Sequence, residues 1–241
     1  MDNSNYLNPY IYRVISDHGL NKPDIDVAIQ PSYTQAYEDV IIEAYIVGYL
    51  ASHSRQLQLI FVEIGANHPV ATSASYLLKQ RFGLHTVLVE ANPELIPALK
   101  QHRLDDTVIH AAVTHQDVKE LPFYLSTDNE ISSMNKEFVK AWKEGAIKDT
   151  IMVPTVRIND IFDAMKLPEN VDIILSIDVE GCDYDILKDI DFQRYKPFII
   201  MVEPSEEFAP GTTKQMMDLL IGQGYILYAK TYANLIFTLR E

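Results

Sequence analysis

The amino-acid sequence predicts an α/β protein with a mostly parallel sheet, helices on both faces of that sheet and an antiparallel hairpin at the C-terminus. From residue 56 onward, short apolar runs rich in β-branched residues alternate with helical patterns, as parallel strands buried on both faces require. The last two apolar segments, 225–231 and 235–240, are separated by only three residues. A connection that short cannot be a parallel crossover, so these two strands are expected to pair as a hairpin.

The expected elements follow in a regular order along the chain. Residues 1–31 are predicted to form an N-terminal extension, and residues 32–241 a single domain whose first helix begins near Ser32 or Tyr33. Strands are expected at 56–65, 85–91, 107–114, 171–181 and 196–204, and helices at 73–82, 93–102, 183–190 and 213–224. This order, closed by the hairpin, is typical of the Rossmann-like sheet of a class I methyltransferase, whereas a dinucleotide dehydrogenase fold continues in parallel.

A long interval, residues 115–170, interrupts this alternation. Within it, 121–126 and 151–158 are predicted strands, and 134–145 is a predicted helix that contains the single tryptophan, Trp142. Ligands bind outside the carboxyl ends of the strands in open α/β sheets. A segment inserted at that edge is therefore a candidate for substrate selection.

Charge and hydropathy exclude several kinds of partner. Twenty basic and 34 acidic residues give a formal net charge of −14, which would repel a nucleic-acid backbone over most of the surface. The longest apolar segment, 40–51, is interrupted by Glu43 and is shorter than the roughly 20 residues that a bilayer requires. The first 30 residues lack the basic and apolar regions of a signal peptide. We therefore expect a cytoplasmic protein that neither spans a membrane nor binds nucleic acid.

The segment FVEIGANHPV, residues 61–70, follows the first predicted strand and lies where such sheets bind ligands. It contains one glycine, Gly65, where a dinucleotide-binding loop has Gly-x-Gly-x-x-Gly, and it lacks the Gly-Lys-Ser/Thr of a P-loop. We therefore expect a nucleoside without a phosphate chain. Glu63 is placed to bind an amino group, and Glu90, at the end of the second strand, to bind both ribose hydroxyls. S-adenosylmethionine combines these groups.

Each of these acids also has a purely structural interpretation, because carboxylates often cap helix N-termini. Their position at two consecutive strand ends, with Gly65 between them, favours cofactor binding. His68 is either a loop residue or a base that acts on the substrate. Pro69 is interpreted as part of the first turn of a helix, where its missing N–H costs nothing.

A second group of acids follows the predicted strand 171–181. Asp178 and Glu180 are two residues apart, so on an extended chain their side chains point to the same side, and Glu203 ends the next strand. Two mechanisms fit this pattern. Either a carboxylate or His68 acts as general base on a substrate hydroxyl, or Asp178 and Glu203 bind a divalent metal ion that orients and acidifies that hydroxyl. The first mechanism needs fewer assumptions.

The chain resembles the FkbM family of S-adenosylmethionine-dependent methyltransferases from about residue 32 to the C-terminus. The resemblance rests on five segments: SYTQAYEDVII (32–42), FVEIGANHPVATSASYLL (61–78), VLVEANPEL (87–95), SIDVEGCDYDIL (176–187) and MVEP (201–204). It differs from the common family pattern at Glu63, where Asp is more frequent, at Pro69, where glycine is common, and at Ser176, where many members have lysine. The resemblance implies O-methylation of a sugar in a glycan or of a secondary metabolite.

The resemblance also implies roles for individual residues. The implied cofactor site consists of Glu63, Gly65, Ala66, Asn67, Ser73, Glu90, Ala91, Asn92, Ala112 and Asp178. Ser73 and Tyr76 would contact the amino acid end of the cofactor. Asp178, Glu180 and His68 are the catalytic candidates. Tyr33, Gln35, Glu38 and Asp39 would cover the pocket, or would serve only to pack the entry helix.

Two alternatives from other functional classes stay open. One is a nicotinamide-dependent oxidoreductase or a nucleotide-sugar enzyme, against which the missing glycines argue. The other is a noncatalytic module with a cofactor-binding fold that serves as a partner surface. The aromatic N-terminus, with Tyr6, Tyr10 and Tyr12, suggests a dimerisation arm and hence a homodimer.

Overall fold

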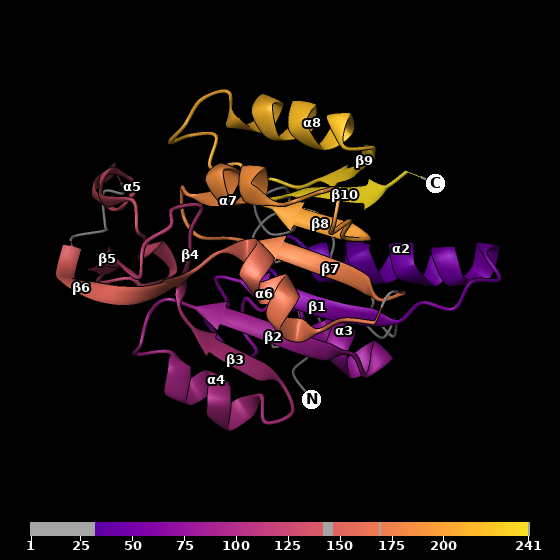
Figure 1. Cartoon of the computed structure of the whole chain (residues 1–241), viewed down its shortest axis with the longest axis horizontal. Coiled ribbons are helices and arrows are strands. Elements are labelled where there is room, and N and C mark those ends of the chain that lie inside the picture. Colours follow the sequence, from indigo (N-terminus) through magenta and orange to yellow (C-terminus); the bar gives the residue numbers. More distant parts are fainter. Residues whose placement is uncertain (1–31, 142–146, 169, 241) are drawn as a thin grey trace, which may run out of the picture.

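The computed structural model describes residues 32–141, 147–168 and 170–240, which form a large sheet between two layers of helices and a small sheet beside it (Figure 1). The large sheet has seven strands: β1 (Leu59–Ile64), β2 (His85–Glu90), β3 (Thr107–His110), β7 (Asp172–Ile177), β8 (Ile199–Val202), β9 (Tyr225–Lys230) and β10 (Leu235–Leu239). The helices against it are α2 (Glu38–Ser52), α3 (Tyr76–Phe82), α4 (Ile96–His102), α6 (Ile158–Met165), α7 (Asp183–Asp189) and α8 (Thr212–Gly222).

The strand order of the large sheet is β3-β2-β1-β7-β8-β10-β9. Strands β3, β2, β1, β7 and β8 are parallel, and β10 is antiparallel to both of its neighbours. This confirms the predicted fold class, including the C-terminal hairpin. The chain turns to one side of β1 for β2 and β3 and to the other side for β7 and β8, so the sheet reverses its order between β1 and β7. Ligands in such sheets bind outside the carboxyl ends of the strands at this reversal.

The two faces of the large sheet bury separate apolar clusters. On one face, Ile161 of α6, Leu187 of α7 and Leu220 of α8 pack against strand residues such as Leu175 and Phe237. The opposite face is covered by α2, α3 and α4, whose contacts with the strands include Ile46 on α2, Leu78 on α3 and Leu99 on α4. Strands buried on both faces explain the continuous apolar runs in the sequence.

The inserted segment forms a small sheet of its own, in the order β4-β6-β5. Its elements are β4 (Ala112–Val113), β5 (Glu120–Ser126), the short helix η2 (Asn129–Ile131), α5 (Lys136–Ala141) and β6 (Ile147–Val156). The prediction of one strand over 107–114 was wrong, because the chain changes sheets at Ala111. The Ala111 N–H still donates to the Glu90 carbonyl at 3.1 Å, but the Thr114 N–H donates to the Val156 carbonyl of β6, also at 3.1 Å.

Some helices also differ from the prediction; α3 and α4, for example, each begin three residues later than expected. Helix α6 was missed, although Ile158, Ile161, Phe162 and Met165 have the i, i+3, i+4, i+7 spacing of a helix face. Helix α2 begins at Glu38, several residues after Ser32, because Tyr37 has a left-handed conformation with φ 63° that interrupts a helix. Trp142 and the N-terminal extension lie outside the described residues.

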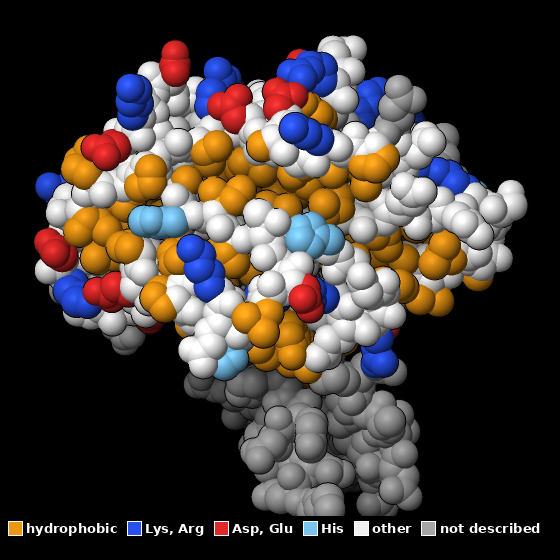
Figure 2. Space-filling view, turned by 60° about the horizontal axis from the view of Figure 1, so that its bottom comes forward, with side chains coloured by type: hydrophobic (Ala, Val, Ile, Leu, Met, Phe, Trp, Pro, Cys, Tyr) orange, Lys and Arg blue, Asp and Glu red, His pale blue; other side chains and the backbone are white. Residues whose placement is uncertain are grey.

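The described surface has a mixed charge pattern. On the face shown in Figure 2, lysine and arginine side chains are scattered among aspartate and glutamate rather than gathered into one basic patch. None of the described helices combines the length and the apolar character that a bilayer span needs.

Truncation of the core is expected to destabilise the protein far more than truncation at the sheet edge. Phe237 of β10 is fully buried, and Phe237→Ala is expected to lower the free energy of unfolding by about 3–5 kcal/mol, measured by urea denaturation. Ile226→Ala, on the exposed edge strand β9, serves as the control and is expected to cost less than about 1 kcal/mol. Equal losses in the two variants would contradict the assignment of β10 to the core.

Candidate active site

One cavity opens at the carboxyl ends of the parallel strands. It contains about 1000 Å³ of space, part of it open to solvent. It is lined by residues at the ends of β1, β2, β7 and β8 and in the turn between β9 and β10. The segment before α2 and the insert complete the lining. The cavity therefore extends along the sheet across the point where the strand order reverses.

Gly65 lets the ends of β1, β2 and β7 come together. Its N–H donates to the Val89 carbonyl at 2.9 Å, while the Asp178 N–H donates to the Ile64 carbonyl at 3.0 Å. A Cβ atom at position 65 would lie 1.7 Å from the Asp178 carbonyl oxygen, and the backbone φ of 83° already disfavours a side chain. Only glycine fits there, which is why the predicted Gly65 is structurally required.

Glu63, on β1, is buried and lines the cavity. Its carboxylate accepts hydrogen bonds from the Ala74 N–H at 2.7 Å and from the hydroxyls of Ser73 and Ser75 at 3.2 and 2.5 Å. Burial raises its pKa, and the bond from Ser75 opposes that rise most strongly. Since a carboxylate accepts about four hydrogen bonds, Glu63 keeps room for one from a ligand.

Arg103, which follows α4, supports this loop from behind. Its guanidinium donates to the Pro69 carbonyl at 3.0 Å, to Ser73 and Ser75 at 3.2 and 3.0 Å, and to Thr86 on β2 at 3.2 Å. Its Nε atom forms a buried ion pair with Asp106 at 2.7 Å. The sequence analysis missed Arg103, because nothing in its local sequence distinguishes it from a surface arginine.

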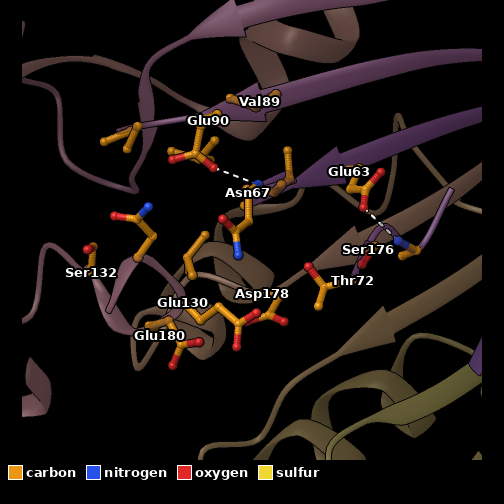
Figure 3. A pocket seen from close by; sticks show the side chains of 18 of the residues that line it. Glu63, Asn67, Thr72, Val89, Glu90, Glu130, Ser132, Ser176, Asp178 and Glu180 are labelled. Carbon is orange, nitrogen blue, oxygen red and sulfur yellow. Dashed lines mark hydrogen bonds between the residues drawn. The ribbon is translucent and has the colours of Figure 1, made fainter. Parts of the chain in front are cut away.

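Glu90 lies where the prediction placed it, at the end of β2 with its carboxylate in the cavity wall (Figure 3). One oxygen accepts from the Asn67 N–H at 2.8 Å and the other from the Asn92 N–H at 2.6 Å. Asn67 has φ 45°, a left-handed conformation that asparagine tolerates better than most residues. Burial raises the Glu90 pKa, and the two backbone N–H groups oppose that rise.

The wall beside Glu90 is mostly apolar. Ala91, Ala111, Ala112 and Val113 come from the stretch where the chain leaves the large sheet, and Phe123 comes from β5 of the insert. An apolar wall next to a buried acceptor of hydrogen bonds suits a nucleoside, since the base is aromatic and the sugar has hydroxyls.

A cluster of acids lies at the other end of the cavity, where Asp178 and Glu180 line the wall and Glu203 lies behind it, lining a neighbouring pocket. Asp178, Glu180 and Glu203 each place one carboxylate oxygen within 4.8 Å of the others. Figure 3 shows Asp178, Glu180 and Glu130 grouped together, away from Glu90. The sequence analysis predicted Asp178, Glu180 and Glu203 as site residues and missed Glu130, which comes from η2 in the insert.

Burial and mutual repulsion raise the pKa values of this cluster. The Asp178 pKa rises to about 6, mainly by burial, and a hydrogen bond with Glu203 partly offsets the rise. Burial and then the charge of Asp178 raise the pKa of Glu203 to about 9. The pKa of Glu180 rises further still, for the same two reasons. Near neutral pH the cluster therefore shares protons among its carboxyl groups.

The loop that carries Asp178 and Glu180 is fastened from both sides. Asp183, the first residue of α7, accepts from the Val179 and Gly181 N–H groups at 2.9 and 3.1 Å. From the insert, the Ser133 hydroxyl donates to the Glu180 carbonyl at 2.7 Å. Glu180 itself has φ 60°, so the extended geometry predicted for residues 178–180 does not occur, although both side chains still reach the cavity.

Several predicted site residues do not line the cavity. His68 is exposed, and its Nδ1 accepts from the Val70 and Ala71 N–H groups at 3.1 and 2.8 Å. Asn92 accepts from the Glu94 N–H at 2.9 Å and so stabilises the turn before α4. Three further predicted residues lie behind the cavity wall. Ala66 packs against Leu88 and Leu99. Ser73 donates a hydrogen bond to Glu63, and Tyr76 packs against the ring of Tyr33.

The residues just before and at the start of α2 show both of the predicted roles, covering the pocket and packing the helix. Gln35 and Glu38 line the cavity. Asp39 does not; it accepts from the Ser32 hydroxyl at 2.6 Å and from the Tyr33 N–H at 2.7 Å, which orders the turn before α2.

Comparison with known proteins gave one family and several solved structures. Residues 63–227 match the model of the methyltransferase FkbM domain. A search of curated proteins gave no match. A precorrin-6y C5,15-methyltransferase from Geobacter metallireducens is 13% identical with a TM-score of 0.45, and the alignment covers 92% of this chain and 97% of that one. A TehB-like SAM-dependent methyltransferase from Corynebacterium glutamicum is 11% identical, with a TM-score of 0.40 and 96% of each chain covered. The N-terminal domain of human METTL16, solved in complex with SAH, is 14% identical with a TM-score of 0.40, covering 95% of this chain and 79% of that one.

A side chain at position 65 is expected to abolish cofactor binding. In Gly65→Ala the new Cβ meets the Asp178 carbonyl, so the ends of β1 and β7 must separate. Calorimetry with S-adenosylhomocysteine is expected to show at least about a tenfold weaker affinity, equivalent to about 1.4 kcal/mol. Gly83→Ala is the matched control, because Gly83 also has a positive φ but a Cβ there has nothing within 4 Å. Equal affinity in the two variants would contradict the close-approach argument.

The ligand-free protein is expected to lose stability as the pH rises from about 5 to about 8. In this range the native state keeps protons on the acid cluster that the unfolded chain has already released, so the free energy of unfolding falls with pH. Groups with a lowered pKa, such as Glu206 at about 2, titrate below the range. Urea denaturation at several pH values between about 5 and about 8 measures how steeply the free energy of unfolding changes with pH. Glu180→Gln should flatten the slope and Glu120→Gln, on exposed β5, should not; a wild-type slope of zero or opposite sign would refute the assignment.

Proposed function

The chain belongs to the FkbM family of S-adenosylmethionine-dependent methyltransferases, and we propose that it methylates a hydroxyl oxygen on a sugar, a glycan or a secondary metabolite. The observation that supports this proposal best is the single cavity that contains Glu90 at the end of β2 and Asp178 at the end of β7. Membership of this family argues against the two alternatives that the sequence left open, a nicotinamide-dependent oxidoreductase or nucleotide-sugar enzyme and a noncatalytic module.

We assign the nucleoside end of the cofactor to the β2 side of the cavity. The carboxylate of Glu90 would accept hydrogen bonds from the ribose hydroxyls, and the apolar wall formed by Ala91, Ala112 and Phe123 would contact the base. The remaining acceptor position on Glu63 would bind the amino group of the methionine part. This arrangement agrees with the sequence-based assignment of Glu63, Glu90 and Asn67, and leaves Ala66, Ser73 and Asn92 in supporting positions.

We assign the proton transfer to Asp178. S-adenosylmethionine supplies a methyl group that is bonded to a positively charged sulfur. When a hydroxyl oxygen attacks that methyl group, its proton must go to a base, and Asp178 has a carboxylate in the cavity with a pKa raised to about 6. A base whose pKa lies near the working pH contributes roughly 10²–10⁴-fold to the rate.

The same assignment keeps the charge in the cavity constant. The reaction removes one positive charge from sulfur and frees one proton from the hydroxyl. Because Asp178 accepts that proton, one negative charge disappears together with the positive one. A buried site avoids the cost of an uncompensated charge in this way.

The acid cluster also supports a metal-dependent version of the reaction. Asp178, Glu180 and Glu203 are carboxylates at a spacing that a hard divalent cation accepts, and such an ion would acidify the hydroxyl without a protein base. The proposed acceptor site lies beside this cluster, where the insert contributes Glu130, Ser132 and Met134 to the wall. We propose no nucleic-acid substrate, in keeping with the net charge of −14.

Replacement of Asp178 is expected to stop methyl transfer but not cofactor binding. Asp178→Asn keeps the side-chain shape and removes the base, so transfer from isotope-labelled S-adenosylmethionine into extracted glycans and metabolites should fall by about 10²-fold or more, followed by mass spectrometry. Affinity for S-adenosylhomocysteine should change by less than about threefold. Asp105→Asn, on an exposed loop, is the control and should keep full activity. Unchanged transfer in Asp178→Asn would refute its role as base. Activity lost in EDTA and restored by Mg²⁺ would favour the metal version.

A further inference from the structure

We propose that the acceptor substrate carries a protonated amine close to the hydroxyl that is methylated, as in an amino sugar or another amino alcohol. This inference rests on the function proposed above and specifies the chemical class of its acceptor. It follows from the charge of the cavity wall and from buried hydrogen-bond acceptors that the fold leaves unused.

The cavity wall is strongly acidic. Six carboxylates line it, and among the described lining residues there is no lysine, arginine or histidine. The six are Glu38, Glu63, Glu90, Glu130, Asp178 and Glu180. An acceptor substrate that brings a phosphate, a carboxylate or a linked nucleotide to the acid cluster would therefore meet repulsion and no cationic side chain.

These six acids fall into two groups. Glu38, Glu63 and Glu90 are engaged by the fold; for example, Glu38 accepts from the Ala36 N–H at 2.9 Å and from the Thr231 hydroxyl at 2.7 Å. For Asp178 and Glu180, by contrast, the neighbouring charges that act most strongly are other carboxylates, including Glu130 from the insert. The second group therefore has no cationic partner among the described lining residues, and a positively charged ligand would supply one.

An independent observation points to a ligand that donates hydrogen bonds. Asn234, in the turn between β9 and β10, lines the cavity and is only 8% exposed, yet its Oδ1 has no partner in the described part of the chain. The Nδ2 group of Asn234 donates to Glu38 Oε1 at 3.4 Å, which leaves the Oδ1 atom of Asn234 to accept a hydrogen bond from a ligand. Glu203, which lines the neighbouring pocket and not this cavity, also has a buried oxygen, Oε2, without a partner among the described residues. Unmet buried acceptors are costly and are usually satisfied by a ligand or water.

The cofactor alone does not balance this charge. Its sulfonium adds one positive charge beside Asp178, while Glu180 and Glu130 still have no cationic partner among the described lining residues. A protonated amine supplies both a positive charge and up to three N–H donors, which matches what the wall lacks. While it stays protonated, that nitrogen has no lone pair, so it serves to bind the substrate and the hydroxyl oxygen remains the nucleophile.

Three sugars of similar size and different charge test the proposal. D-glucosamine, D-glucose and D-glucuronate are titrated by calorimetry into the full chain saturated with S-adenosylhomocysteine, in the presence of EDTA. Glucosamine is expected to bind at least about tenfold more tightly than glucose, and glucuronate more weakly than glucose. Glu180→Gln should reduce the preference for glucosamine, whereas Glu120→Gln, which removes an equal charge outside the cavity, should keep it. Both variants are first checked for S-adenosylhomocysteine affinity, which reports that they are folded.

The outcomes separate this proposal from the one on which it rests. Equal affinities for glucosamine and glucose, tighter binding of glucuronate, or no binding of glucosamine by the S-adenosylhomocysteine complex would each overturn the amine proposal and leave the methyltransferase intact. Failure of S-adenosylhomocysteine itself to bind would instead contradict the methyltransferase function. In a second arm MgCl₂ replaces EDTA. If Mg²⁺ binds the wild type but not Asp178→Asn and removes the glucosamine preference, the cluster is a metal site and the amine proposal is wrong.

Discussion

The buried guanidinium of Arg103 is the interaction on which the cofactor half of the molecule depends. It is 2% exposed and would be costly without partners, but it has Asp106 on one side and the Glu63 network on the other. Its planar fork reaches Pro69, Ser73, Ser75 and Thr86, which belong to the loop after β1 and to β2. One side chain thus fixes the loop, through its serines, around the carboxylate of Glu63. At this end of the cavity the carboxylates of Glu63 and Glu90 are held in place by hydrogen bonds from within the protein.

The opposite end of the cavity is organised differently. There the fold brings Asp178, Glu180 and Glu203 together with few internal donors, so the ligand-free protein carries an electrostatic cost that protons on the cluster partly relieve. A cofactor or substrate that brings positive charge replaces those protons. This contrast supports the proposal that one end of the cavity positions a nucleoside while the other end favours a positively charged methyl donor.

Much of the fold was readable from sequence because it depends on local signals. The alternation of apolar runs and helical patterns located every strand of the large sheet, and the three residues between the last two strands required the hairpin. The strand-end acids Glu63, Glu90 and Asp178 were readable because parallel strands end at one edge. The change of sheet at Ala111 was not, since the apolar run continues through it and only pairing with Val156 ends it. Arg103, Glu130 and Asn234 were also missed, because their roles depend on contacts between segments far apart in sequence.

The pairing of β4 with β6 has a consequence for how this cavity can be altered. Ala112 is opposite Thr155, and Val113 is opposite Val156, so the inserted segment leaves and re-enters the domain through two adjacent parallel strands. The junction is therefore narrow, and it lies at 113 and 156 rather than at the broader limits 115 and 170 expected from sequence. Because the insert is attached through one short ladder, we expect that it can be exchanged between related enzymes as a unit. Such a graft must preserve Ala111 and Ala112, which line the cavity.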